Sequence, residues 1–272
     1  MRNQSNKPYM CGSTARVLSL PKIVWMLWLQ GWSQAPDIVR ACLQTWKYHN
    51  PGWEIHALTN SSIPEFLDVT EVLSPIAGKP VQHEALSDVI RIALLQRYGG
   101  VWADATVYCL KPLDAWLPEK LSSGFLAFAK PVPDRMLSSW FFAASKGHYI
   151  VQQWRKLTCE YWAIRNERDH YFWFHHLFEQ GYRSDPLFKT LWDATPETSA
   201  DGPHYYVPYD QKLSRPATAI DQLLINNASV PLLKLTHKLR PNKYQSNSVL
   251  RTLCDRAAQL VSVHNERESP RP

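Results

Sequence analysis

The chain has 272 residues, of which 45% are hydrophobic, so it can fill the core of one large domain or two small ones and is not disordered throughout. Its net charge of +6 and pI near 9.0 favour anionic partners: sugar nucleotides, an acidic polysaccharide, a membrane surface or nucleic acid. Its Lys and Arg residues form no long basic run, and its five cysteines include no CxxC pair, so neither a nucleic-acid-binding arm nor a zinc or redox motif is expected.

Both ends of the chain differ from the middle in composition. Residues 1–20 are polar without a continuous apolar segment, and residues 263–272 are charged and contain prolines, so we expect a disordered N-terminus and a flexible tail. The apolar run at 23–32 is too short to span a bilayer. We therefore expect a soluble cytoplasmic protein that contacts the inner membrane face only peripherally.

Strands and helices are expected to alternate in the first half. The apolar, β-branched and aromatic residues of 22–29 predict a buried strand, and Pro36, followed by apolar residues at helical spacing, predicts a helix over 35–50. Residues 53–59 predict a second strand and residues 62–69 a short helix. This order favours parallel strands joined by helical crossovers.

A largely buried helix over 84–98 is predicted by two apolar stripes. Gly99 and Gly100 follow it, and because glycine readily adopts positive φ they should end the helix. Residues 101–110 then predict a strand interrupted by polar residues. Asp104 is therefore expected in or beside a central strand.

The second half of the chain predicts a mixture of elements. Strands are expected over 124–130 and 139–145, helices over 148–164, 170–182 and 219–228, and a late strand or loop over 234–238.

Asp88 and Arg91 lie three residues apart on the predicted helix, so their side chains share one face. Ser87 precedes them as the expected N-cap. A local ion pair at a helix N-terminus would explain this spacing by itself. Arg91 could instead bind phosphate groups, since a guanidinium offers several donors in a fixed arrangement.

Asp104 ends a mostly apolar strand, and a carboxylate there is costly to bury unless it meets a cation or hydrogen-bond donors. A divalent metal would meet that need, and such an ion also stabilises the charge that develops on a leaving diphosphate. The alternative is a turn aspartate that accepts hydrogen bonds from nearby backbone.

The segment SDVIRIALLQRYGGVWADAT, residues 87–106, resembles the donor-site signature of the DXD-containing sugar-transferase family (glycosyltransferase family 32-like), which includes bacterial capsular polysaccharide synthesis proteins. PKIVWMLWLQG resembles that family's first strand, and SSWFFAASKGH and KLTHK resemble the capsular group more loosely. The resemblance implies an α/β fold: a GT-A-type (Rossmann-like) mixed sheet flanked by helices, in a single domain with a helical acceptor-side extension. Residues 21–114 would form the nucleotide-sugar-binding half and residues 115–262 the acceptor-side half.

The same resemblance implies a glycosyltransferase that moves a sugar from a nucleotide-sugar donor to a growing capsular or other surface polysaccharide. A glycan or lipid-linked glycan would be the acceptor. The reaction would proceed with retention at the anomeric carbon, with a divalent cation, Mn²⁺ or Mg²⁺, and with no covalent cofactor.

Five residues match positions that contact the donor in this family. Asp88 and Arg91 match residues that hold the sugar and phosphates, and Asp104 matches the first Asp of the DXD motif. Trp28 matches the aromatic residue that stacks on the nucleobase. Asn60 is a weaker match to a donor-contacting position.

Thr106 departs from the family pattern, because it stands where the family often has a second, metal-ligating Asp. A neutral hydroxyl is a poorer metal ligand than a carboxylate. The metal would then be held by Asp104, the diphosphate and water, or with help from a residue of the C-terminal half such as His237. The other interpretation of His237 is an ordinary surface or core histidine.

Two further hypotheses about function stay open. The first is a non-catalytic protein that binds nucleotide sugars or glycans on the same fold, motivated by Thr106. The second is a nucleic-acid-binding protein, but the chain has no recognisable motif for it, and we expect no nucleic-acid partner. His175 and His176 mark either an acceptor cleft or ordinary helix packing, and Trp140 either stacks on sugar or packs in the core.

Overall fold

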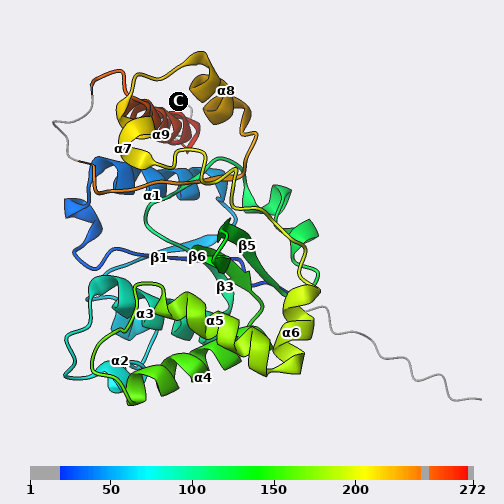
Figure 1. The fold of residues 1–272 in the computed structure, drawn as a ribbon. Helices are drawn as coiled ribbons and strands as arrows, with labels where there is room; N and C mark the ends of the chain where they lie inside the picture. The colour runs from blue at the N-terminus through cyan, green and yellow to red at the C-terminus, as the bar shows by residue number, and fades with distance from the viewer. Residues whose placement is uncertain (1–18, 240–244, 269–272) are drawn as a thin grey trace, which may run out of the picture.

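The computed structural model describes residues 19–239 and 245–268 and places a mixed sheet between two layers of helices (Figure 1). The sheet has the strand order β2-β1-β3-β6-β5. Its strands are β1 (Ile23–Leu27), β2 (Glu54–Leu58), β3 (Gly100–Ala103), β5 (Phe125–Val132) and β6 (Arg135–Ala144). Two short strands, β4 (Val107–Cys109) and β7 (Leu232–Lys234), pair with each other outside it.

The centre of the sheet is parallel and one edge is antiparallel. Strand β1 pairs in parallel with β2 and with β3, so that Val24 lies between Ile55 and Val101. Strand β6 runs antiparallel to both β3 and β5. The parallel crossovers expected from the alternation of strands and helices are confirmed, and the two halves of the chain build one sheet.

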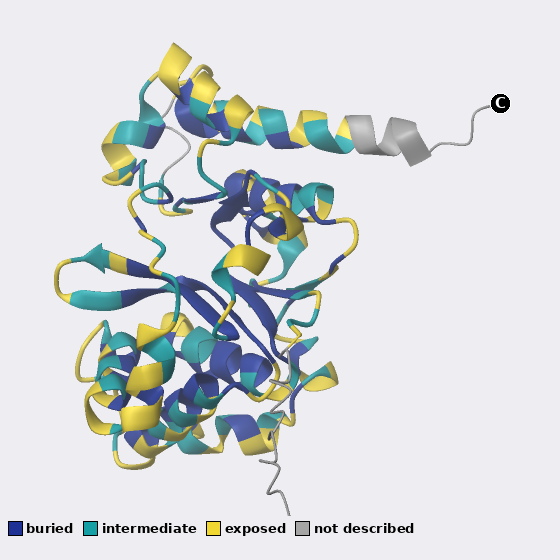
Figure 2. Cartoon of the chain, turned by 90° about the vertical axis from the view of Figure 1, so that its right-hand side faces the viewer, coloured by how far each residue is buried: buried dark blue, intermediate teal, exposed yellow. Residues whose placement is uncertain are grey.

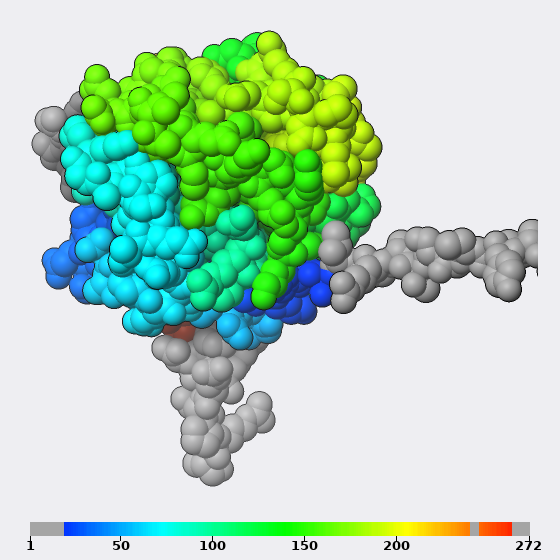
Figure 3. Space-filling model, turned by 90° about the horizontal axis from the view of Figure 1, so that it is seen from below, coloured from blue at the N-terminus to red at the C-terminus, as the bar shows by residue number. Residues whose placement is uncertain are grey.

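Helices cover both faces of the sheet, and buried residues concentrate on its strands (Figure 2). The layer above it in Figure 1 contains α1 (Asp37–His49), α7 (Tyr209–Ser214), α8 (Ala219–Asn227) and α9 (Val249–Glu268). The layer below, which Figure 3 shows from outside, contains α2 (Val69–Leu73), α3 (His83–Tyr98), α4 (Tyr149–Ala163), α5 (Trp173–Ser184) and α6 (Pro186–Asp193).

Alternation along β1 explains the two faces, because successive side chains of a strand point to opposite sides. Trp25 and Leu27 join the core below the sheet, and Val24 and Met26 join the core above it. Among the described residues, no helix combines the length and the apolar content that crossing a bilayer requires.

Several expected elements differ from the structure. Residues 62–69 form no single helix: a 3₁₀ turn at Ile63–Glu65 precedes α2, whose N-cap Asp68 accepts backbone N–H groups. The interrupted strand over 101–110 is two strands, β3 and β4, in different sheets. The helix α9 was not expected, and it makes residues 263–268 of the expected flexible tail helical, while residues 1–18 and 269–272 lie outside the described part.

The Gly99–Gly100 turn joins α3 to β3 as the sequence predicts. Both glycines have positive φ, at +71° and +93°. A Cβ at Gly100 would lie 2.6 Å from the carbonyl oxygen of Ile23, so only glycine lets β3 approach β1 this closely. This close approach places the end of β3, and with it Asp104, beside the end of β1.

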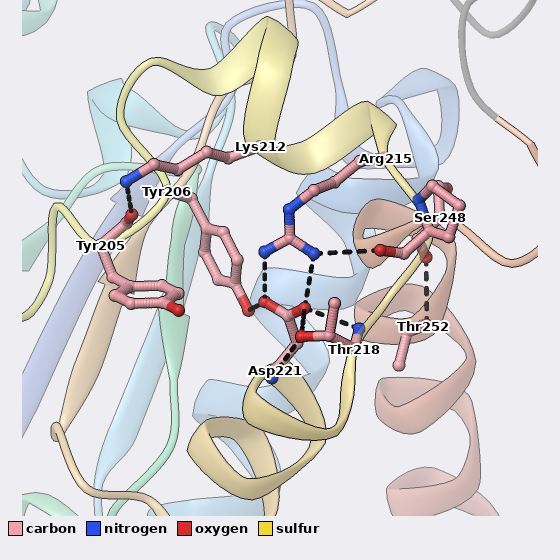
Figure 4. A network of polar contacts seen from close by, with 9 residues as sticks. Tyr205, Tyr206, Lys212, Arg215, Thr218, Asp221, Ser248 and Thr252 are labelled. Carbon is pink, nitrogen blue, oxygen red and sulfur yellow. Dashed lines mark hydrogen bonds and ion pairs between the residues drawn. The ribbon is translucent and has the colours of Figure 1, made fainter.

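An ion pair between a buried carboxylate and a partly exposed guanidinium connects the upper helices (Figure 4). Asp221, fully buried at the start of α8, accepts hydrogen bonds from Arg215 at 2.6 and 2.9 Å and from the Tyr206 hydroxyl at 3.1 Å. Thr218, the N-cap of α8, forms a capping box with Asp221. This network fixes α7 and α8, the two helices that precede β7.

Candidate functional site

A cavity of about 550 Å³ opens at the carboxyl ends of the parallel strands β1 and β3. Ligand sites of open α/β sheets commonly lie at this edge. The cavity is lined by residues from the β1 end, α3, the β3 end, α5 and β7 with the segment after it, among them Trp28, Ser87, Asp88, Arg91, Asp104, Thr106, His175, Lys234 and His237.

Asp104 is the carboxylate at the centre of this cavity. One of its oxygens, Oδ1, accepts from Arg91 Nη2 at 3.1 Å and from Trp102 Nε1 at 2.9 Å, and the other, Oδ2, lies 3.4 Å from Lys234 Nζ. Burial by itself would raise the pKa of Asp104, but Arg91, Lys234 and the Trp102 N–H together hold it below its usual value. Asp104 is therefore an anion at neutral pH.

The buried guanidinium of Arg91 bridges two carboxylates. Its guanidinium lies 3.0 Å from Asp88 Oδ1 and 3.1 Å from Asp104 Oδ1, and its side chain is 6% exposed. It also donates to the carbonyl oxygen of Ser139 at 2.6 Å and packs over the Trp102 ring. Arg91 therefore fixes the position of the carboxylates, and its donors are largely occupied.

Asp88 faces the Arg91 guanidinium from the second turn of the buried helix α3. Burial raises its pKa to about 7, against the lowering effect of Arg91. The helix begins at His83, one residue before the predicted start, but the expected N-cap was wrong: Gln82 stands at that position. Ser87 is an interior residue that accepts from Arg91 Nη2 at 3.3 Å. The spacing of Asp88 and Arg91 on one face is confirmed.

Trp28 and His237 form one wall of the cavity. Their rings meet edge to face, with centroids 5.1 Å apart. Burial, followed by the charges of Lys238 and Lys234, lowers the pKa of His237. Asn60 is not brought to the site: it is exposed, it is absent from the cavity lining, and its backbone N–H donates to Leu29.

Lys234 is the site residue that sequence reasoning missed. Its ammonium lies 2.5 Å from Thr106 Oγ1 as well as 3.4 Å from Asp104 Oδ2. Register explains the contact, because β7 pairs with β4 so that Lys234 lies opposite Val107. The only local signal was the loose resemblance of KLTHK to the capsular group.

The residues around Asp104 do not fit a preformed divalent-metal site. Mg²⁺ and Mn²⁺ prefer oxygen ligands, and Mg²⁺ at a phosphate site is usually held by one or two free carboxylates together with water and the substrate phosphates. Both oxygens of Asp104 already face cations or donors, and the Thr106 hydroxyl is bonded to Lys234. Within the described part of the chain, no three His, Cys, Asp or Glu side chains are grouped to hold a metal, His237 included.

The three remaining aromatic candidates lie in three different places: one lines the cavity, one is on the surface and one is in the core. His175 lines the cavity, and burial, with Arg135 and Arg91 nearby, lowers its pKa to about 3, so it is neutral at pH 7. His176 is exposed and stacks on His170. Trp140 is 7% exposed and stacks on Phe128, so it packs in the core.

Fold and site together define a GT-A-type α/β protein, and the fold class predicted from the sequence is confirmed. The apo-form glycosyltransferase GlyE of Streptococcus pneumoniae TIGR4 superposes with a TM-score of 0.53 at 12% identity, over 93% of this chain and 65% of that one. At this identity the likeness shows the fold alone.

The profile of the family described as "Capsular polysaccharide synthesis protein" matches residues 9–253, and the chain belongs to this family. The O-glycosyltransferase braB of Annulohypoxylon truncatum is 26% identical over 201 residues, covering 65% of this chain and 44% of that protein. The initiation-specific alpha-1,6-mannosyltransferase of Saccharomyces cerevisiae is 28% identical over 123 residues, covering 42% and 26%. The chain spans less than half the length of these curated relatives.

Proposed function

We propose that this chain is a glycosyltransferase that moves a sugar from a nucleotide-sugar donor to a glycan or lipid-linked glycan acceptor of a capsular or other surface polysaccharide. The observation that carries the proposal is the cavity at the ends of β1 and β3, in which Asp88, Arg91 and Asp104 converge beside Trp28. Membership in the capsular polysaccharide synthesis family and relatives named as glycosyltransferases support it.

Each group in the cavity has a place in this reaction. Trp28 is half-buried in the wall and offers an aromatic surface to a nucleobase. The carboxylates of Asp88 and Asp104 suit the hydroxyl groups of a sugar, because an ionised carboxylate is a strong hydrogen-bond acceptor. Lys234 lines the same cavity beside Asp104, and its ammonium suits a phosphate.

The transfer balances without any redox partner. The bond between the anomeric carbon and the phosphate oxygen breaks, and its electron pair goes to that oxygen. The acceptor hydroxyl oxygen bonds to the anomeric carbon, and its proton ends on the released nucleoside diphosphate. Retention, with the acceptor arriving on the face that the diphosphate leaves, belongs to the proposal, as does a location in the cytoplasm at the inner membrane face.

A binding and turnover panel tests the proposal. UDP-, GDP- and CMP-sugars are screened by thermal shift, where a ligand at 100 times its Kd stabilises the fold by about 2.7 kcal/mol. One donor class should raise the melting temperature and then be hydrolysed slowly to its free nucleotide, which is UDP or GDP for the diphosphate donors that the proposal expects and CMP for a CMP-sugar. Tight binding without turnover, whatever glycan acceptor is offered, would identify a non-catalytic binding protein, and no binding at all would refute the proposal.

A further inference from the structure

The DXD-like segment at residues 104–106 has a cationic side chain of the protein beside it. Thr106 replaces the second acidic residue expected there, and the Lys234 ammonium lies against both the Thr106 hydroxyl and Asp104 Oδ2. An Asp at 106 would have offered a carboxylate to a metal, whereas a Thr hydroxyl accepts a hydrogen bond from an ammonium. A Thr at position 106 is therefore consistent with a lysine beside it, since the hydroxyl accepts the hydrogen bond that the ammonium donates.

The backbone holds Lys234 in this place. Strand β7 pairs antiparallel with β4, and the backbone N–H of Leu235 donates to the Thr106 carbonyl oxygen at 2.9 Å. The backbone N–H of Lys234 donates to Pro203. The side chain of Lys234 is 17% exposed and lines the cavity. Because its backbone belongs to the paired strand β7, its position is fixed by the pairing with β4.

The cations beside Asp104 disfavour a further cation at this carboxylate. Two carboxylates, Asp88 and Asp104, face two cations, Arg91 and Lys234. A divalent ion bound at Asp104 would lie beside the Lys234 ammonium, and like charges at short range in a partly buried cavity repel strongly. A diphosphate would instead gain an attractive partner, because the ammonium of Lys234 has three donors and only two of them face Asp104 and Thr106.

We propose that Lys234 takes the part of the divalent cation: its ammonium binds the diphosphate of the donor, and donor binding requires no metal. This inference rests on the proposed glycosyl transfer. As the bond from the anomeric carbon to the phosphate oxygen breaks, the electron pair passes to that oxygen and Lys234 donates a hydrogen bond to it, keeping its own proton. The acceptor hydroxyl proton leaves with the diphosphate, as in the transfer described above.

Calorimetric titration with UDP and GDP tests the inference on the intact chain, with EDTA or with Mn²⁺. The wild-type Kd for the diphosphate that binds should agree within about twofold in the two conditions. Lys234→Met should weaken binding by about tenfold or more, as the loss of one charged hydrogen bond predicts. Lys234→Arg should keep most of the affinity, and Lys156→Met, on the exposed face of α4, should match the wild type.

A gain of metal binding provides a second readout that does not depend on activity. The variant Thr106→Asp with Lys234→Met restores two carboxylates at the segment and removes the ammonium. In the presence of the diphosphate it should deplete the electron paramagnetic resonance signal of free Mn²⁺ further than the diphosphate alone does, and the wild type should not. Wild-type binding that EDTA abolishes and Mn²⁺ restores would overturn the inference and leave the proposed function standing, whereas no diphosphate binding in either condition would overturn both.

Discussion

Replacing Arg91 with Met should destabilise the protein strongly. Met has a similar length but no charge, so the substitution leaves the buried carboxylates of Asp88 and Asp104 without their shared guanidinium. It also frees the Ser139 carbonyl oxygen, which now accepts from Arg91 at 2.6 Å. Removing one member of a buried ion pair costs about 3–5 kcal/mol, and we expect a loss in that range at pH 7.

The loss is measured by urea unfolding followed through tryptophan fluorescence. The matched control is Arg183→Met, which removes an exposed i,i+4 pair with Glu179 on α5 and should cost less than about 1 kcal/mol. Adding Asp104→Asn to the Arg91→Met variant should recover part of the stability, because Asp104 is the carboxylate that stays ionised at pH 7 when Arg91 is gone. A loss in Arg91→Met no larger than in the control would show that Arg91 does not hold the carboxylates together.

Three further predictions concern the turn, the titration and the wall of the cavity. Gly100→Ala should lower the free energy of unfolding by roughly 1–3 kcal/mol, because its φ is +93° and the new Cβ would meet the Ile23 carbonyl; equal urea midpoints would contradict this. Since burial raises the pKa of Asp88 from 3.8 to about 7, its contribution to stability is present below about pH 4 and is lost as pH rises through 7. Unfolding experiments across that range should show the wild type losing stability, on the order of a few kcal/mol, and Asp88→Asn should not show this loss. Trp28→Ala should raise the Kd for the donor about tenfold, measured by titration, while the melting temperature of the free protein changes little.

Local sequence was sufficient to predict the part of the site whose residues lie close together in the chain. The strand β1, the helix α3 and the glycine turn after it follow from apolar runs and glycine chemistry, and they bring Asp88, Arg91 and Asp104 together. The same reasoning misplaced Ser87, since a serine interior to a helix looks like an N-cap when the preceding turn carries polar residues.

Lys234 could not be predicted from local sequence, because its partner Thr106 lies 128 residues earlier and a single lysine carries no spacing signal. Only the pairing of β4 with β7 brings them together. The helix α9 had a readable pattern, with buried Val249, Leu253 and Ala257 at helical spacing, but the charged residues at its end suggested a tail.

The most direct test of the central claim is the release of nucleoside diphosphate from the bound donor by the wild type and by Asp104→Asn. Asn keeps the shape of the side chain but removes the charge, and Asp193→Asn on the exposed surface of α6 serves as the control. Asp104→Asn should lower the rate at least about a hundredfold, the scale of losing one charged group at a reacting centre, while the control keeps the wild-type rate. Equal rates for Asp104→Asn and the wild type would contradict the assignment of this cavity as the site of transfer.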